Sequence, residues 1–218
     1  IIKDNKTPII VGGTGLYLNS LIYGIDYPDI KTDLNYRKEL EEKVNKDGLE
    51  EIYKEAKIID PIAVEKISKN DKKRILRILE IYHSTGKTKT ELEKESRKNG
   101  IKYDYRIFVL NMPRCELYER INKRVDIMIK EGLIEEVKKI ISKYKEFPTA
   151  MQGLGYKEVV EFLENKITKE EMIEKIKMET RRYAKRQLTW FKSYKEATWL
   201  DSNNTNNVDI ILEDISEK

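Results

Sequence analysis

A short apolar run that ends in glycines constrains the fold more than any other feature of this chain. Residues 8–11 read Pro-Ile-Ile-Val, and they are followed by Gly12–Gly15 and an apolar segment. This order predicts a strand, a glycine turn and a helix. A strand that is apolar on both faces is typical of a parallel sheet covered by helices. The turn would let an anion approach the backbone, although a tight turn capped by Thr14 explains these residues equally well.

Two further strands are predicted at residues 105–112 and 197–201, which are rich in residues that favour strands. The segment 31–99 carries only helical patterns. We therefore predict an α/β fold with two domains. Residues 1–30 and 100–218 would form a core around a parallel sheet, and residues 31–99 would form an all-helical insertion.

Several residues mark the starts and ends of helices. Residues 86–88 read Gly-Lys-Thr, but a phosphate loop needs a glycine where this chain has Ile81, and it needs a preceding strand where a helix is predicted. We therefore interpret Gly86 as a helix stop. Helix caps are expected at Asp60 before Pro61, at Asn70 or Asp71, at Thr88 or Thr90, and at Thr168, which forms a capping box with Glu171.

Two predicted helices are strongly basic. The helix that ends near residue 194 contains Arg181, Arg182, Lys185 and Arg186 on one broad face, and their mutual repulsion would be offset by a polyanion. A solvated surface is the other interpretation. The opposite side, with Tyr183, Ala184, Gln187, Leu188 and Phe191, is expected to face the core. The helix predicted at residues 72–83 also has two faces. Its core face consists of Ile75, Ile78, Leu79 and Tyr82. Its basic face consists of Lys73, Arg74 and Arg77.

The composition excludes several classes of protein. Lysine and arginine number 43 against 39 acids, so the net charge of +4 points to local basic patches and not to a general nucleic-acid coat. A single cysteine cannot form an internal disulfide, and one cysteine with one histidine is too few ligands for a typical zinc site. No apolar run reaches membrane-spanning length. We expect a cytoplasmic monomer that does not bind membranes. Because residue 1 is not Met, we also expect the sequence to be the C-terminal part of a longer protein.

Taken together, six ordered segments resemble the bacterial tRNA dimethylallyltransferases, which are also called tRNA isopentenyltransferases. The resemblance covers nearly all 218 residues. A set of six segments in the right order is far more specific than any one of them. The segments are residues 8–17, 70–80, 85–88, 117–125, 153–157 and 182–191.

The resemblance implies a phosphate-loop-kinase-like core that binds nucleotides such as ATP and is incomplete here, with a helical insertion that grips the tRNA anticodon stem-loop. The implied reaction moves a dimethylallyl group from dimethylallyl diphosphate to the exocyclic N6 amine of the adenosine just 3′ of the anticodon. Pyrophosphate leaves, with Mg²⁺ bound through it and through the family's N-terminal segment. Within these residues no metal ligand is implied.

The resemblance also assigns roles to individual residues. Thr14 would contact the target adenosine, and Arg124 would serve the leaving pyrophosphate. The implied pyrophosphate-binding residues are Arg120, Arg124, Arg182, Lys185 and Arg186. The implied tRNA-binding residues are Thr14, Arg37, Lys73, Arg74, Arg77, Gln152, Gly153, Leu154, Gly155, Tyr156 and Lys157.

One departure from the family pattern is the lack of its phosphate loop and of the aspartate that would act as general base. Both would belong to a preceding segment of about 80–100 residues, so we expect these 218 residues alone to be inactive. Three alternatives stay open at this point. They are an adenylate isopentenyltransferase acting on free nucleotide, a small-molecule kinase that shares the core, and a non-catalytic RNA-binding module.

Overall fold

The computed structural model describes residues 1–25, 30, 33–98, 100–144 and 150–216. It divides into two compact units: Leu16–Tyr105, here called the helical unit, and Ile1–Gly15 with Arg106–Lys218, here called the core unit. The predicted linker at residues 27–29 and the predicted insertion ends at residues 31 and 99 lie outside the described residues. Assignment of residues 31–99 to tRNA binding stays a prediction.

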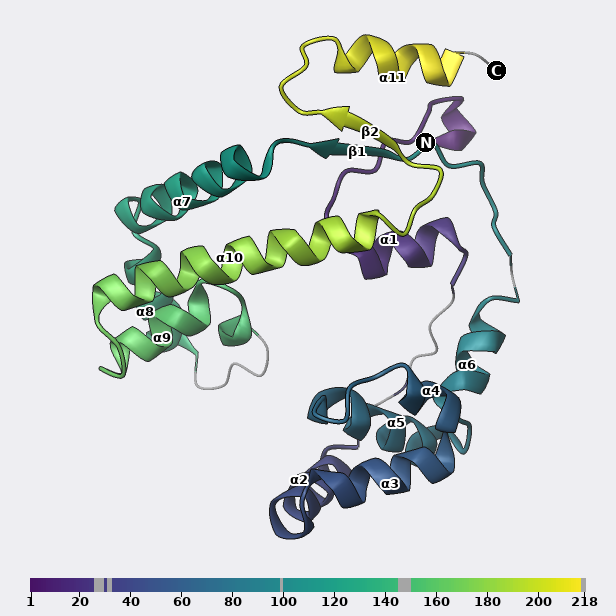
Figure 1. Cartoon of the computed structure of the whole chain (residues 1–218), viewed down its shortest axis with the longest axis vertical. Helices are drawn as coiled ribbons and strands as arrows, with labels where there is room; N and C mark the ends of the chain where they lie inside the picture. Colours follow the sequence, from purple (N-terminus) through teal and green to yellow (C-terminus); the bar gives the residue numbers. More distant parts are fainter. Residues whose placement is uncertain (26–29, 31–32, 99, 145–149, 217–218) are drawn as a thin grey trace. The chain divides into compact units, whose positions relative to one another are not determined.

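The core unit contains a parallel pair of strands. Strand β1 (Phe108–Asn111) pairs with β2 (Thr198–Asp201), with Val109 opposite Trp199 and Leu110 opposite Leu200 (Figure 1). Val109 and Leu200 are buried. They are one residue out of register, and successive side chains of a strand alternate, so each face of the strand pair buries one of them. The predicted α/β fold with a parallel sheet and all-helical regions is confirmed, although both strands are shorter than predicted.

The third predicted strand, at residues 8–11, is wrong. These residues have no regular secondary structure, and Ile9 and Val11 are 82% and 92% exposed. A strand forms only where its backbone groups can pair with a neighbour. Within the described residues β1 and β2 pair only with each other, so the apolar run has no strand beside it to join.

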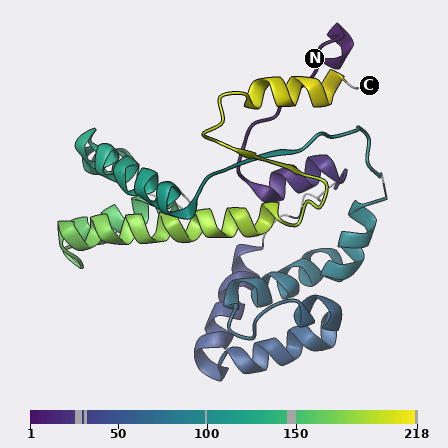
Figure 2. The same ribbon diagram turned by 45° about the horizontal axis from the view of Figure 1, so that its top comes forward.

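Helices make up most of the core unit. The apolar faces of α7 to α10 form one cluster that includes Val125, Val137, Val159, Met172 and Ile176. Helices α7 and α10 run side by side in both ribbon views (Figures 1 and 2). The elements are η1 (Ile2–Asp4), α7 (Arg114–Lys130), α8 (Leu133–Lys143), η2 (Ala150–Gln152), α9 (Tyr156–Leu163), α10 (Lys169–Phe191) and α11 (Asn207–Ser216).

The helical unit is built around α5, which buries Ile75, Leu76, Ile78 and Leu79 against its neighbours. Tyr82 was expected in this core but is 42% exposed, because the buried stripe continues through Glu80 and Ile81 instead. The elements are α1 (Gly15–Ile22), α2 (Leu34–Asp47), α3 (Leu49–Ile59), α4 (Pro61–Glu65), α5 (Lys72–Thr85) and α6 (Lys89–Ser96).

The predicted helix caps and the stop at Gly86 are confirmed, whereas the basic helix α10 ends at Phe191 and not near residue 194. Asp60 caps α4, Asp71 caps α5, and Gly86 ends α5 in the left-handed conformation with φ 67°. Thr88 opens α6 with a capping box, and Thr168 opens α10 in the same way with Glu171. None of the described helices is both long and apolar enough to cross a membrane.

Candidate active site

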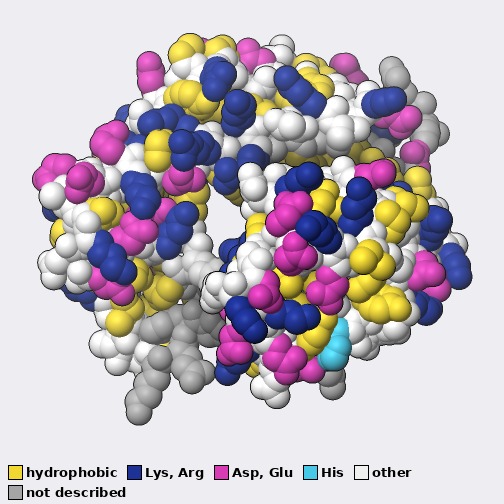
Figure 3. Space-filling model, turned by 60° about the horizontal axis from the view of Figure 1, so that its bottom comes forward, with side chains coloured by type: hydrophobic (Ala, Val, Ile, Leu, Met, Phe, Trp, Pro, Cys, Tyr) yellow, Lys and Arg dark blue, Asp and Glu magenta, His cyan; other side chains and the backbone are white. Residues whose placement is uncertain are grey.

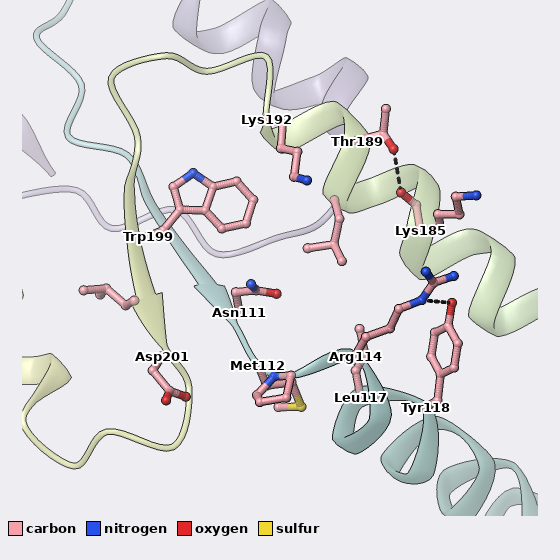
Figure 4. Close-up of a pocket in the computed structure, with 13 residues that line it drawn as sticks. Asn111, Met112, Arg114, Leu117, Tyr118, Lys185, Thr189, Lys192, Trp199 and Asp201 are labelled. Atoms are coloured by element: carbon pink, nitrogen blue, oxygen red, sulfur yellow. Dashed lines mark hydrogen bonds between the residues drawn. The ribbon is translucent and has the colours of Figure 1, made fainter.

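A cavity of about 640 Å³ lies in the core unit where β1 and β2 end (Figure 4). Its walls come from the ends of both strands, the first turn of α7 and the last turns of α10. The lining residues are Asn111, Met112, Pro113, Arg114, Leu117, Tyr118, Lys185, Leu188, Thr189, Lys192, Trp199, Leu200 and Asp201.

Strand direction places this cavity at the edge of the sheet that usually carries a ligand. Because β1 and β2 are parallel, Asn111 and Asp201 stand opposite each other at the carboxyl ends. Ligands of parallel α/β sheets bind outside these ends. Pro113 then begins α7 without a side-chain cap, so the unpaired N–H groups of the first helical turn add positive potential there.

The cavity lining includes the cations Arg114, Lys185 and Lys192. Arg114 donates from Nε to the Tyr118 hydroxyl at 2.8 Å, and its guanidinium lies 5.1 Å from the centre of that ring. In the described part of the chain, no carboxylate oxygen lies within 4.0 Å of the charged groups of these three side chains. The lining also includes one carboxylate, Asp201, so three cations against one acid leave the cavity with net positive charge, which favours an anion.

Apolar side chains form another part of the lining. Leu117, Leu188 and Leu200 line the cavity together with the ring of Trp199. Cations beside an apolar surface suit a ligand that has an anionic head and a short hydrocarbon part. Among the described residues no three His, Cys, Asp or Glu side chains converge as a metal site would require.

The glycine loop of residues 12–15 is held by the same helix, α10. Gln187 donates from Nε2 to the carbonyl oxygen of Gly13 at 2.9 Å. A Cβ atom on Gly13 would collide with the Gln187 amide, and one on Gly15 would collide with the indole of Trp190. The Gln187 amide ends a flexible side chain and can move, whereas the indole of Trp190 is rigid, so glycine is required most strictly at position 15. Thr14, between the two glycines, is exposed.

Helix α10 serves the cavity and the loop with different faces. Lys185, Thr189 and Lys192 follow the helical spacing of four and three residues and line the cavity. Gln187 and Trp190 lie three residues apart on another face and contact the loop. One rigid element thus fixes both parts of the candidate site.

Of the five residues predicted to bind pyrophosphate, Lys185 is among those lining the cavity. Arg120 reaches the cavity-lining Met112, with Nη1 at 3.9 Å from the sulfur. Arg124 lies exposed on α7, one turn further from the strand. Arg182 pairs with Glu179 at 2.6 Å, and the Arg186 guanidinium lies 5.8 Å from the ring centre of Tyr183. Their roles stay predictions.

The predicted tRNA-binding residues of the helical unit lie on α2 and α5. Arg37 and Arg77 each place a guanidinium nitrogen 3.1 Å from the carboxylate of Glu80, whose side chain is only 3% exposed. Arg74 pairs with Asp71 at 3.4 Å, and Lys73 is exposed. These cations belong to the helical unit, whereas the cavity belongs to the core unit.

The remaining predicted tRNA-binding residues, 152–157, form the junction of η2 and α9 in the core unit. Gly155, with φ 93°, donates its N–H to the fully buried Glu158, which also pairs with Lys157 at 3.3 Å. The Tyr156 hydroxyl binds Glu136, and this hydrogen bond raises the pKa of the tyrosine.

Sequence reasoning missed four residues of the site. Arg114 and Lys192 line the cavity, and Gln187 and Trp190 hold the loop. Arg114 comes two residues after the end of a predicted strand, and that position was a usable signal for a ligand site. A glutamine on an expected core face also needs a hydrogen-bond partner, which here is the Gly13 carbonyl group.

Comparison with known proteins identifies the family. The sequence profile of the family described as IPP transferase matches residues 1–194. The chain belongs to this family. It is 45% identical over 202 residues to the tRNA dimethylallyltransferase of Halothermothrix orenii, covering 92% of this chain and 62% of that protein. It is 41% identical to the Acetivibrio thermocellus tRNA dimethylallyltransferase, covering 99% and 69% of the two chains.

Solved structures of IPP transferases give the same result. The full-length tRNA isopentenylpyrophosphate transferase of Bacillus halodurans has 37% identity and a TM-score of 0.62, covering 99% of this chain and 67% of that one. A eukaryotic dimethylallyltransferase acting on tRNA has 30% identity and a TM-score of 0.74, covering 100% and 59%. The chain thus spans about three fifths to two thirds of these relatives.

Proposed function

We propose that this chain forms part of a tRNA dimethylallyltransferase. The enzyme would transfer a dimethylallyl group from dimethylallyl diphosphate to N6 of the adenosine 3′-adjacent to the anticodon. The observation that carries the proposal is the double role of α10, which contacts the loop around Thr14 with one face and lines a cationic, partly apolar cavity with another. The activities for which the relatives are named support the same proposal.

In this reaction the lone pair of the adenine N6 forms a bond to C1 of the dimethylallyl group. The bond between C1 and the diphosphate oxygen breaks, and pyrophosphate leaves with that electron pair. The amine also gives up a proton to a general base, which the family resemblance assigns to an aspartate outside these 218 residues. Because negative charge grows on the leaving group, catalysis needs fixed positive charge beside it.

Arg114, Lys185 and Lys192 would supply that charge, since they line the cavity without carboxylate partners in the described residues. Leu117 and Leu188 would contact the dimethylallyl chain. Arg120, through its contact with Met112, lies close enough to the lining to join the diphosphate contacts. Mg²⁺ belongs to the same proposal, although the described residues form no cluster of three His, Cys, Asp or Glu ligands for it.

Thr14 would bind the acceptor base. Gln187 is hydrogen-bonded to the neighbouring Gly13 carbonyl and the indole of Trp190 lies against Gly15, so contacts on both sides restrain the backbone of Thr14. A threonine hydroxyl can both donate to and accept from an adenine edge. The helical unit, with Arg37, Lys73, Arg74 and Arg77, would contact the RNA backbone. A monomeric state and a cytoplasmic location are part of this proposal.

The test uses the native protein that contains these residues, with dimethylallyl diphosphate and an unmodified anticodon stem-loop. Mass spectrometry should find one dimethylallyl group on the adenosine 3′ of the anticodon. Thr14→Val should lower kcat/KM by about 100-fold, whereas Thr14→Ser should retain most of the activity. Transfer to free adenosine nucleotide and not to RNA would overturn the tRNA assignment.

A further inference from the structure

A second cavity, of about 270 Å³, lies within the helical unit and is distinct from the candidate active site. Its apolar wall is Ala63, Ile67 and Ile78. The other lining residues are all cationic, namely Lys66, Arg74, Arg77 and Lys89. These side chains are open to solvent, with Arg74, Arg77 and Lys89 69%, 41% and 38% exposed, so an anion can reach them. An apolar wall lined otherwise by cations favours an anionic group that has an apolar part.

A buried carboxylate fixes the geometry of this cavity. Asp60 is 2% exposed and accepts hydrogen bonds from the backbone N–H of Ala63 at 3.0 Å and from the N–H and hydroxyl of Thr90 at 2.8 and 2.7 Å. These bonds tie the start of α6 to the start of α4. Lys89 precedes Thr90 directly and Lys66 ends α4, so the tie brings these two lysines to one cavity.

Three of the four cations form ion pairs with carboxylates that do not line the cavity. Arg74 pairs with Asp71 at 3.4 Å, Arg77 with Glu80 at 3.1 Å, and Lys89 with Glu93. Lys66 has no carboxylate oxygen within 4.0 Å among the described residues. Such pairs orient a side chain while leaving its other donors free, since a guanidinium has five N–H groups and an ammonium three.

We propose that this cavity binds one phosphodiester group of the RNA substrate, with the adjoining ribose against the apolar wall. The volume lies just below the usual range of small-molecule pockets, about 300–1,000 Å³, and therefore suits one group of a polymer better than a whole cofactor. Figure 3 shows one face of the molecule, on which acidic and basic side chains are mixed around the histidine. The inference rests on the proposed tRNA function and adds Lys66 and Lys89 to its binding residues.

The test compares two double variants of the native protein. Lys66→Ala/Lys89→Ala removes two cations of the cavity, whereas Lys46→Ala/Lys57→Ala removes two exposed lysines of the same unit that lie on α2 and α3. Affinity for the anticodon stem-loop is measured by filter binding at several salt concentrations. The first variant should bind about tenfold more weakly, and the slope of log K against log salt should fall by about 1. The control should bind like the wild type.

Two results would overturn the inference. In one, both double variants bind the stem-loop equally well. In the other, free adenosine monophosphate binds the wild-type protein as tightly as the RNA does and loses affinity in Lys66→Ala/Lys89→Ala, which would make the ligand a free nucleotide. If the proposed function itself fails, the wild type will not bind or modify the stem-loop at all, so the two failures can be told apart. Equal thermal unfolding of both variants will show that the folds are intact.

Discussion

The cavity of the core unit and the basic surface of the helical unit hold their cations in different ways. In the core unit Arg114, Lys185 and Lys192 line a cavity with no carboxylate within 4.0 Å of them in the described residues. In the helical unit Arg37 and Arg77 share the carboxylate of Glu80, which is almost completely buried. Apart from Lys66, the cations lining the helical unit's own cavity also have acidic partners.

This difference matches two kinds of anion. Unpaired cations repel one another and gain most from a compact ligand with several negative charges, such as a diphosphate. Paired cations keep less net charge but have fixed directions, because a carboxylate held by two guanidiniums restrains both of them. Fixed, partly neutralised cations suit the regular backbone of an RNA, where position matters more than total charge.

The largest effect is expected from Gly15→Ala in the core unit. The added Cβ would collide with the rigid indole of Trp190, so the loop that carries Thr14 must move. A shift of about 1 Å at a reacting group costs about 100-fold in rate. We expect kcat/KM for prenyl transfer to fall by about that factor in a steady-state assay.

The matched control is Gly12→Ala in the same loop. A Cβ atom there would have no heavy atom within 4 Å, so activity should stay near that of the wild type. Equal losses in the two variants would show that the loop tolerates no side chain at all, and the contact with Trp190 would then explain nothing.

The next largest effect is expected from Asp60→Ala in the helical unit, whose cohesion depends on buried carboxylates. The change leaves the N–H groups of Ala63 and Thr90 without their acceptor and removes the cap of α4. We expect a loss of about 2–3 kcal/mol in the free energy of unfolding. Urea unfolding measures it, and Glu42→Ala, an exposed acid on α2, should change the free energy by less than about 0.5 kcal/mol.

A smaller effect is expected when single cavity cations of the core unit are removed. Lys185→Ala and Lys192→Ala should each weaken pyrophosphate binding about tenfold, since each removes one charge-assisted contact. Inhibition of the native enzyme by pyrophosphate measures this. Lys195→Ala is the control, because Lys195 is exposed and does not line the cavity. If all three variants keep the inhibition constant of the wild type, the diphosphate binds elsewhere.

The smallest expected effect is a difference between the two units in the pH at which each unfolds in acid. In the helical unit the pKa of Asp60 is lowered, since hydrogen bonds from Thr90 and Ala63 outweigh its burial, and the pKa values of Asp33, Glu91 and Glu95 are lowered by hydrogen bonds from Tyr36, Thr88 and Lys87. In the described core unit, Glu171 has a carboxyl pKa lowered in this way by Thr168.

A carboxylate whose pKa is lowered by folding adds stability that is complete above the pKa of the unfolded chain, about 4. That stability is lost as the pH falls through the lower folded-state pKa. We therefore expect the helical unit to unfold before the core unit on acidification from pH 5 to pH 2. Amide NMR signals of the two units can follow this, and earlier loss of the core-unit signals would contradict it.

The sequence predicted helix ends well because their signals are local. Asp60, Asp71, Gly86, Thr88 and Thr168 all act within four residues of their own position. The strand at residues 8–11 failed for the opposite reason. Its residues suit a buried strand, but a strand depends on pairing with another segment, and no local pattern tells whether that segment lies beside it.

The candidate site was predictable only in part, because many of its residues that lie close together in space are far apart in the sequence. Lys185 was found from the density of cations around it. The bond from Gln187 to Gly13 spans 174 residues, and no spacing rule connects the two. Arg114 and Lys192 face one cavity because β1 and β2 are adjacent and parallel, which becomes visible only when the strands are paired.

The placement of Trp190 and Trp199 allows ligand binding at the candidate site to be followed by intrinsic tryptophan fluorescence. They are the two tryptophans of the sequence, one beside Gly15 and one in the wall of the larger cavity, and the helical unit contains none. Both are partly exposed, at 39% and 37%, so their fluorescence responds to what covers them. A change in intrinsic emission on adding a ligand therefore reports on the core unit, without any attached dye.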